Sequence, residues 1–313
     1  MSKSLRNRTL KLGTRGSLLA LWQANWTKSA IERHHDVDVD LVRIKTTGDQ
    51  ILDVPLAEVG GKGLFTKELD EALLDGRVDL VVHSMKDLPY QLPPGILLSA
   101  VPAREDRRDA LVSDGRNLAA LPAGARIGTS SLRRQVQLKH RFGELDVVPL
   151  RGNVDTRLGK FDAGEYDGII LAAAGLKRLG HGSRITELLE DEVMLSAIGQ
   201  GALALVCRSD DSSTEEVLRT LDHPNTHTAV LAERSLSAFL NGSCQVPIGG
   251  NARLDGDRLV LKGLIGSLDG TKIITDSVTG GADAAEEIGA RLGRRLLASG
   301  GAAILDEISA SGT

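Results

Sequence analysis

The sequence predicts an α/β protein made of two similar lobes and a smaller α+β domain. A strand, a glycine turn and a helix occur in succession near residue 10, and the same pattern returns near residue 126. The motif Gly-x-apolar-Asp-x-apolar-apolar occurs at 76–82 and again at 164–170. After residue 245 the texture changes to short alternating strands and one helix. Two patterns in the same order predict two open α/β sheets, although short pattern matches also arise by chance.

The first lobe is predicted from residue 10 onward. Residues 10–13 read as a strand, 14–17 as a turn that opens a helix over 18–33, and 37–45 as a second strand. Such a junction aims free backbone N–H groups at an anion. Residues 46–63 contain many glycines and prolines and predict a long loop, followed by a helix at 64–74 and a strand at 78–82.

The second lobe and the C-terminal domain follow. Residues 126–132 repeat the opening pattern, and a strand is predicted at 202–206 and helices at 213–221 and 226–240. Alternation predicts strands at 251–254, 258–265 and 272–278, joined by Asp-Gly turns, and then a helix over 282–299 that ends at Gly300 and Gly301. The predicted domains are therefore 1–103 with 201–221, then 104–200, and then 222–313. Ligands of open α/β sheets lie beyond the carboxyl ends of strands, so two facing lobes would enclose a cleft.

Composition restricts the class of protein. Hydrophobic content of 41% and charged content of 26% are typical of a soluble globular chain. The sequence shows neither a signal peptide nor a membrane-spanning run, so we expect a cytoplasmic protein with no membrane partner. Residues 101–184 carry 15 Lys and Arg against 10 Asp and Glu, although the net charge is −4. This distribution, with only 3% aromatic residues, favours a local anionic ligand over nucleic acid.

The two cysteines predict neither a disulfide nor a metal site, because Cys207 and Cys244 have no CxxC or paired-histidine context. Cys244 follows a helical segment and precedes Pro247, so its thiol is expected to be presented on a loop. A lone cysteine is nevertheless more often a small buried hydrophobe. Cys207 ends an apolar strand and is predicted to be packed in the core.

Arginine placement is the most informative chemical pattern. Six arginines fall in or just after predicted strand-to-helix loops: Arg15, Arg133, Arg134, Arg151, Arg157 and Arg178. Arginine holds a carboxylate through two parallel hydrogen bonds and keeps its charge, so the set suits a ligand with several carboxylates or phosphates. Each of them taken singly could be an ordinary surface residue. Asp87 lies beside Lys86 at a strand end, where a carboxylate could stabilise positive charge or cap a turn.

Seven motifs together resemble the hydroxymethylbilane synthase (porphobilinogen deaminase) family. They run in family order: TRGS at 14–17, GKGLF at 61–65, HSMKDLP at 83–89, GTSSLRRQ at 128–135, LRGNVDTRL at 150–158, AGLKRL at 174–179 and GSCQVP at 242–247. The resemblance implies two lobes like those of periplasmic binding proteins plus a small α+β domain. It also implies condensation of four porphobilinogen molecules, with loss of ammonia, into hydroxymethylbilane.

The resemblance further implies a dipyrromethane cofactor joined by a thioether to Cys244, and a monomeric enzyme of tetrapyrrole and heme biosynthesis. Asp87 matches the catalytic aspartate of the family. Residues at cofactor-binding positions are Lys86, Ser84, Thr129, Ser131, Arg133, Arg134 and Arg157. Residues at substrate-binding positions are Arg15, Arg151, Arg157, Arg178, Lys62, Phe65 and Gln200.

Other functions would leave features of the sequence unexplained. A two-lobed binding protein for a polycarboxylate would share the lobes and arginines but would give Cys244 no role. A cysteine hydrolase would need a histidine that lowers the thiol pKa, and the seven histidines form no recognisable partner motif.

Overall fold

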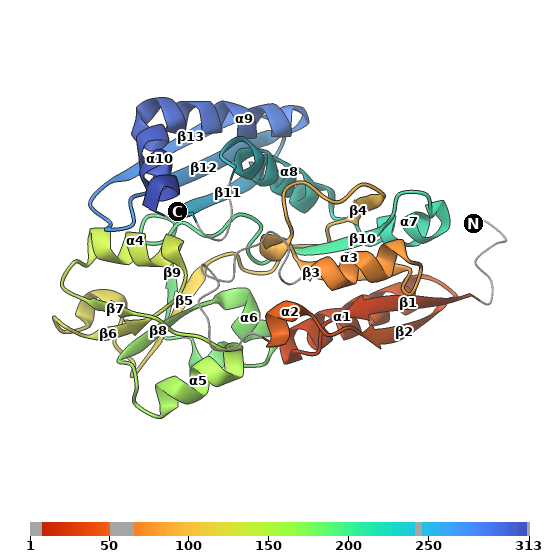
Figure 1. The fold of residues 1–313 in the computed structure, drawn as a ribbon, viewed down its shortest axis with the longest axis horizontal. Helices are drawn as coiled ribbons and strands as arrows, with labels where there is room; N and C mark the ends of the chain where they lie inside the picture. The colour runs from red at the N-terminus through yellow and green to blue at the C-terminus, as the bar shows by residue number, and fades with distance from the viewer. Residues whose placement is uncertain (1–7, 51–65, 242–245, 312–313) are drawn as a thin grey trace. The chain divides into compact units, whose positions relative to one another are not determined.

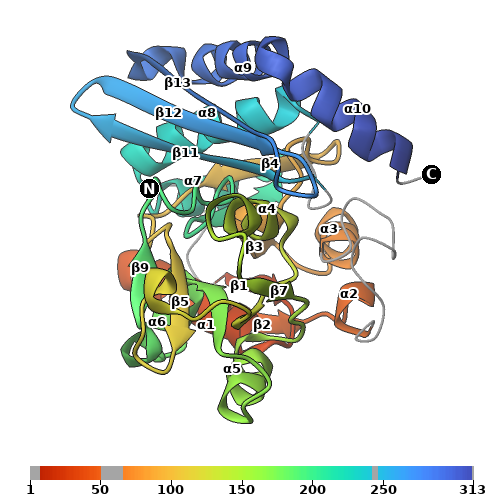
Figure 2. The same cartoon turned by 90° about the vertical axis from the view of Figure 1, so that its left-hand side faces the viewer.

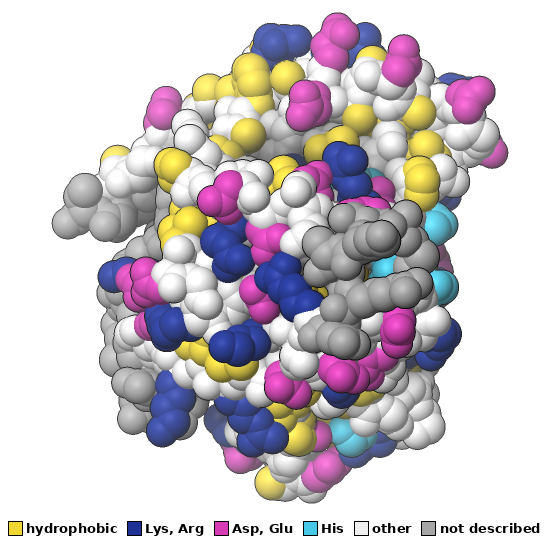
Figure 3. All heavy atoms as spheres, turned by 90° about the vertical axis from the view of Figure 1, so that its right-hand side faces the viewer, with side chains coloured by type: hydrophobic (Ala, Val, Ile, Leu, Met, Phe, Trp, Pro, Cys, Tyr) yellow, Lys and Arg dark blue, Asp and Glu magenta, His cyan; other side chains and the backbone are white. Residues whose placement is uncertain are grey.

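The computed structural model describes residues 8–50, 66–241 and 246–311 of the 313-residue chain. The chain divides into two compact units: Met1–Glu105 with Ala202–His227, and Asp106–Gly201 with Thr228–Thr313. The three-part domain division stays a prediction. None of the described helices is long and apolar enough to cross a membrane. On the face drawn in Figure 3, basic side chains lie interspersed with acidic ones.

The first unit contains a five-stranded sheet in the order β2-β1-β3-β10-β4 (Figure 1). Strands β1 (Thr9–Thr14), β2 (Asp38–Arg43) and β3 (Leu80–Ser84) are parallel. Strand β10 (Leu203–Arg208) returns antiparallel to both β3 and β4 (Ile96–Ala100). Helix α1 (Leu18–His34) is capped by Ser17, whose hydroxyl accepts a hydrogen bond from the amide of Ala20 at 3.3 Å.

The described part of the first unit also contains three shorter helices: α2 (Thr47–Gln50), α3 (Lys67–Leu74) and α7 (Ser212–Arg219). Buried residues of α1 and α7 pack in one core with alternate residues of β1, β3 and β10. The predicted loop at 46–63 is wrong at its start, where Thr47–Gln50 makes a helical turn. The rest of that loop, 51–63, lies outside the described residues.

The second sheet repeats the first one strand for strand. Its order is β7-β6-β8-β5-β9, with β6 (Arg126–Gly128) parallel to both β7 (Asp146–Val148) and β8 (Gly168–Ala172). Strand β5 (Asp109–Ser113) is antiparallel to β8 and to β9 (Glu187–Leu189). These are the neighbours and directions of the first sheet, so the predicted pair of similar lobes is confirmed.

The aspartate of the repeated Gly-x-apolar-Asp motif makes an equivalent hydrogen bond in both sheets. Asp79 accepts a hydrogen bond from the amide of Lys11 at 2.8 Å, and Asp167 accepts one from the amide of Arg126 at 2.8 Å. Asp79, just before β3, is thus bonded to β1, and Asp167, just before β8, is bonded to β6. The motif glycines Gly76 and Gly164 have φ values of 70° and 77°, which L side chains rarely adopt.

Helices cover both faces of the second sheet. Leu111 and Ile170 belong to one core with Leu138 of α4 (Leu132–Arg141). Their neighbours in β5 and β8 point the other way, into a core that includes residues of α5 (Val154–Asp162) and α6 (Ala173–Arg178). Residues of β5 and β8 are therefore buried on both sides.

The C-terminal part of the second unit is an antiparallel sheet packed on helices (Figure 2). Its strands are β11 (Ile248–Asp255), β12 (Arg258–Gly266) and β13 (Ile273–Gly281), and residues of α8 (Pro224–Phe239) and α9 (Ala285–Leu296) share one core with them. The predicted helix over 282–299 is observed as a 3-10 turn at Ala282–Ala284 that leads into α9, and its predicted end at Gly300 is confirmed. Gly300, at φ 110°, separates α9 and its last turn from α10 (Ala302–Ser311).

Candidate functional site

The predicted site residues of the first unit follow two adjacent parallel strands. Arg15 follows β1, while Lys86 and Asp87 lie in the short 3-10 turn Met85–Asp87 that follows β3. Carboxyl ends of neighbouring parallel strands meet at one sheet edge, so these side chains share that edge. Lys86 and Asp87 are exposed, and Arg15 is half-buried.

Two further residues support this edge. Ser84, half-buried, accepts a hydrogen bond from Nε2 of Gln23 on α1 at 2.8 Å. His83 is buried within β3, and burial, together with the nearby charge of Arg15, lowers its pKa to about 4. The imidazole is therefore neutral near pH 7. Cys207 is also buried as predicted, and burial raises its pKa to about 11.

The predicted residues of the second unit also gather at carboxyl ends of parallel strands. Thr129, Ser131, Arg133 and Arg134 follow β6, the segment with Arg151 and Arg157 follows β7, and Arg178 ends the helix that follows β8. Because β7, β6 and β8 are neighbours, one edge of this sheet receives all of these residues.

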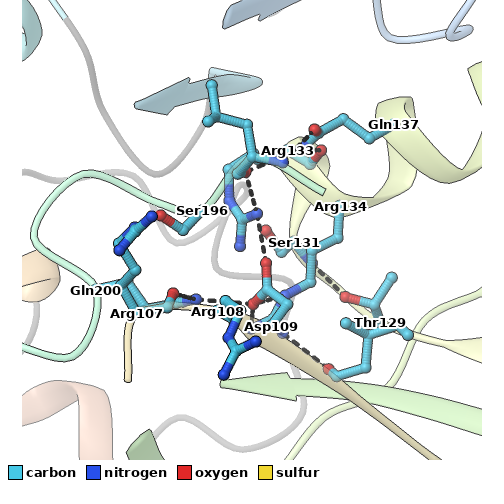
Figure 4. A network of polar contacts seen from close by, with 12 residues as sticks. Arg107, Arg108, Asp109, Thr129, Ser131, Arg133, Arg134, Gln137, Ser196 and Gln200 are labelled. Carbon is cyan, nitrogen blue, oxygen red and sulfur yellow. Dashed lines mark hydrogen bonds and ion pairs between the residues drawn. The ribbon is translucent and has the colours of Figure 1, made fainter. Parts of the chain in front are cut away.

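Arg133 and Arg134 are buried. Both bind Asp109, the first residue of β5 (Figure 4): Arg133 Nη1 lies 2.7 Å from Oδ2, and Arg134 Nη2 lies 2.6 Å from Oδ1. Arg133 Nη1 also donates to the carbonyl of Leu195, and Arg134 Nη1 to that of Ile170. Burial alone would raise the pKa of Asp109, but the two guanidiniums outweigh it and hold that pKa well below its usual range.

Gln200 joins the same network. Its Nε2 donates to Asp109 Oδ1 at 2.9 Å and to the carbonyl oxygen of Arg107 at 2.8 Å, and its side chain is buried. Sequence reasoning missed Asp109, which lies in the charged run 104–109 and resembles a surface residue there. The run of charges gives no sign of which member is buried.

Two further arginines, Arg157 and Arg178, donate hydrogen bonds to backbone carbonyls. Arg157 donates from Nε to the carbonyl of Gly152 at 2.8 Å, and Arg178 donates from Nη2 to that of Gly201 at 2.7 Å. Both are half-buried, as are Arg151 and Ser131, whereas Thr129 is buried. The predicted residues Lys62, Phe65 and Cys244 lie outside the described part of the chain.

Within the described ranges, no group of three or more His, Cys, Asp or Glu side chains could hold a metal ion. The donors at these strand ends are guanidinium, ammonium, hydroxyl and amide groups. These groups suit an anionic organic ligand with several carboxylates.

Two family models match the chain. One, described as "Porphobilinogen deaminase, dipyromethane cofactor binding domain", matches residues 10–216, and the other, the C-terminal domain of porphobilinogen deaminase, matches 227–298. The chain belongs to the porphobilinogen deaminase family. Relatives named porphobilinogen deaminase include those of Trichlorobacter lovleyi, 52% identical over 96% of each chain, and of Syntrophotalea carbinolica, 54% identical over 95% of each. Family membership confirms the enzyme class, the tetrapyrrole pathway and the dipyrromethane cofactor predicted from the sequence.

Solved structures of binding proteins are more distant. The periplasmic aliphatic sulphonate binding protein SsuA of Escherichia coli is 14% identical and covers 74% of this chain, which covers 70% of that protein, with a TM-score of 0.40.

Proposed function

We propose that this chain condenses four porphobilinogen molecules head to tail and releases the linear tetrapyrrole hydroxymethylbilane. The observation that carries this proposal is identity above 50% to porphobilinogen deaminases along almost the whole chain. Each addition breaks the C–N bond of one aminomethyl group and a C–H bond at the free ring carbon of the terminal pyrrole, forms one C–C bond and releases ammonia. Water then cleaves the C–C bond between the primer and the tetrapyrrole: its hydroxyl becomes the hydroxymethyl group of the product and its hydrogen returns to the primer ring. Monomeric state and cytoplasmic location stay predictions.

The residues of the second unit fit a dipyrromethane cofactor. Each pyrrole ring of porphobilinogen carries an acetate and a propionate, so the group needs several fixed donors. Among the described residues, no acceptor reaches the buried Nε of Arg133. A buried N–H without an acceptor costs about 1–3 kcal/mol, and a ligand carboxylate would satisfy it. Once bound, the cofactor supplies the terminal pyrrole to which porphobilinogen adds.

We assign the cofactor to the thiol of Cys244 as a thioether, and its carboxylates to the residues that match cofactor-binding positions of the family. Those residues are Ser84, Lys86, Thr129, Ser131, Arg133, Arg134 and Arg157. The incoming porphobilinogen and the growing chain would be held by Arg15, Arg151, Arg157, Arg178 and Gln200, with Lys62 and Phe65 from the segment outside the described residues. Arg157 is assigned to both the cofactor-binding and the substrate-binding set.

Asp87 is the proposed catalytic residue. When ammonia leaves porphobilinogen, a cationic azafulvene remains, and a nearby carboxylate stabilises the positive charge that develops in the transition state. The same carboxylate can accept and return the protons of the pyrrole nitrogen and the leaving amine. Its exposed place at the carboxyl end of β3, beside Lys86, makes it available to a ligand at that edge.

The intact mass of the purified protein tests the proposal. We expect an adduct of two pyrrole units on the wild-type chain, its loss in Cys244→Ser, and its retention in the matched control Cys207→Ser, because Cys207 is buried in the first unit. An active wild-type protein with an unmodified mass would contradict the proposal. So would an adduct that persists in Cys244→Ser.

A further inference from the structure

One buried carboxylate joins three side chains to which ligand binding is assigned above. Asp109 has no solvent exposure, and its two oxygens accept hydrogen bonds from Arg133 Nη1 at 2.7 Å, from Arg134 Nε and Nη2 at 3.0 and 2.6 Å, and from Gln200 Nε2 at 2.9 Å (Figure 4). These donors come from α4 and from a segment more than 60 residues later in the chain. Asp109 is therefore the common acceptor of the network.

Asp109 is unsuited to bind the ligand itself. A carboxylate repels the acetate and propionate groups of porphobilinogen, and solvent does not reach this side chain. Its charge nevertheless matters, because two buried guanidiniums without a counter-ion would repel each other. The carboxylate of Asp109 reduces the combined charge of Arg133, Arg134 and Asp109 to +1, which allows both arginines to stay buried.

The contacts of Asp109 also fix the direction of each planar guanidinium. Arg134 donates three hydrogen bonds, two to Oδ1 of Asp109 and one to the carbonyl of Ile170. To the residues that the structure describes, Arg133 donates through Nη1, which Asp109 and the carbonyl of Leu195 share. The Nε of Arg133 is left as a buried donor that no described residue accepts from.

We propose that Asp109 is a positioning residue for cofactor attachment. It acts through Arg133, Arg134 and Gln200 by setting where their donors point, and it touches neither cofactor nor substrate. The inference rests on the proposed function, because it assumes that Arg133 and Arg134 meet the carboxylates of a dipyrromethane. It adds a buried anion to a site otherwise defined by its cations.

Two substitutions separate positioning from simple charge compensation. Asp109→Glu keeps the counter-charge, so the protein should fold, but the added methylene shifts the carboxylate and with it the guanidiniums by about 1 Å or more, a displacement that costs on the order of 100-fold in a positioned reaction. Asp109→Asn keeps the shape and removes the charge. Asp114, an exposed carboxylate paired with Arg116 at 2.7 Å in the same lobe, provides matched controls as Asp114→Glu and Asp114→Asn.

The readout is the rate at which cofactor-free protein acquires the adduct. Each chain is produced in cells that cannot make porphobilinogen, checked for folding by circular dichroism and thermal unfolding, and mixed with porphobilinogen, and its intact mass is followed over time. We expect folded Asp109→Glu to gain the adduct at least about 10-fold more slowly than wild type. Asp109→Asn should gain little or none, and both Asp114 variants should match wild type.

The outcomes distinguish the inference from the proposed function. Wild-type protein that gains no porphobilinogen-derived mass would defeat the proposed function. If folded Asp109→Glu gains the adduct at the wild-type rate, only the positioning role is defeated, because the charge alone would then suffice. An Asp109→Glu chain that does not fold would also overturn the inference, since the contribution of Asp109 would then be to the fold.

Discussion

Replacing Asp87 with asparagine tests the catalytic assignment most directly. The amide has nearly the shape of the carboxylate but carries no charge and is a poor base. Because Asp87 is exposed in a turn after β3, we expect the substitution to change the free energy of unfolding by no more than about 0.5 kcal/mol. Folding and cofactor attachment should therefore survive.

The expected loss is in turnover. Removal of a charge that stabilises the transition state, together with a group that transfers protons, should lower the rate by about 10²–10⁴. That range corresponds to about 3–5 kcal/mol of transition-state stabilisation. The large ratio of the kinetic to the folding effect is the signature of a residue that acts on the reaction.

Ammonia release from porphobilinogen gives the rate, and intact mass before the assay reports the cofactor content of each preparation. Asp75→Asn is the control, since Asp75 is also an exposed carboxylate of the first unit and follows α3. Turnover of Asp87→Asn within about two-fold of wild type, at equal cofactor content, would refute the assignment. A missing adduct in this variant would place Asp87 in cofactor binding instead.

Three further predictions concern stability. Gly289→Ala should destabilise the protein by about 1–3 kcal/mol, because a Cβ there would lie 2.4 Å from the carbonyl oxygen of Ala232 on α8. The control is Gly159→Ala on α5, where a Cβ would meet nothing within 4 Å and stability should be unchanged or higher by up to about 1 kcal/mol. Urea titrations measure both changes. His83 is held neutral with a pKa of about 4, so the fold binds fewer protons than the unfolded chain and loses stability as pH falls from about 6.5 to 4; thermal scans should show a weaker pH dependence over that window in His83→Gln, and an unchanged dependence would contradict the burial argument. Burial raises the pKa of Asp70 to about 6, so this group favours the fold only at low pH and its contribution is lost as pH rises through 6; Asp70→Asn should raise the melting temperature at pH 8 and not at pH 4, and equal shifts at both would argue against a buried charge.

Local patterns in the sequence carried most of the architecture. The strand–turn–helix openings and the paired Gly-x-apolar-Asp motifs predicted two matching sheets, and the roles of Asp79 and Asp167 explain why the motif recurs. The strands that were not predicted include β4, β5 and β9. Each pairs with a partner that the chain supplies far away in the sequence, as when β5 pairs with β8 about 60 residues later, so no local periodicity marks them.

The sequence by itself determined the family, the arginines and Asp87, because motifs and residue chemistry are local properties. Only the tertiary structure decided which charges are open and which are buried. The sequence gives no sign of a counter-ion for Arg133 and Arg134, whereas in the structure both pair with Asp109, the first residue of β5. In the sequence, Asp109 is one charge among several in the run 104–109. Burial and pairing depend on chain segments that meet in space, and this is why the buried anion of the site was invisible in the sequence.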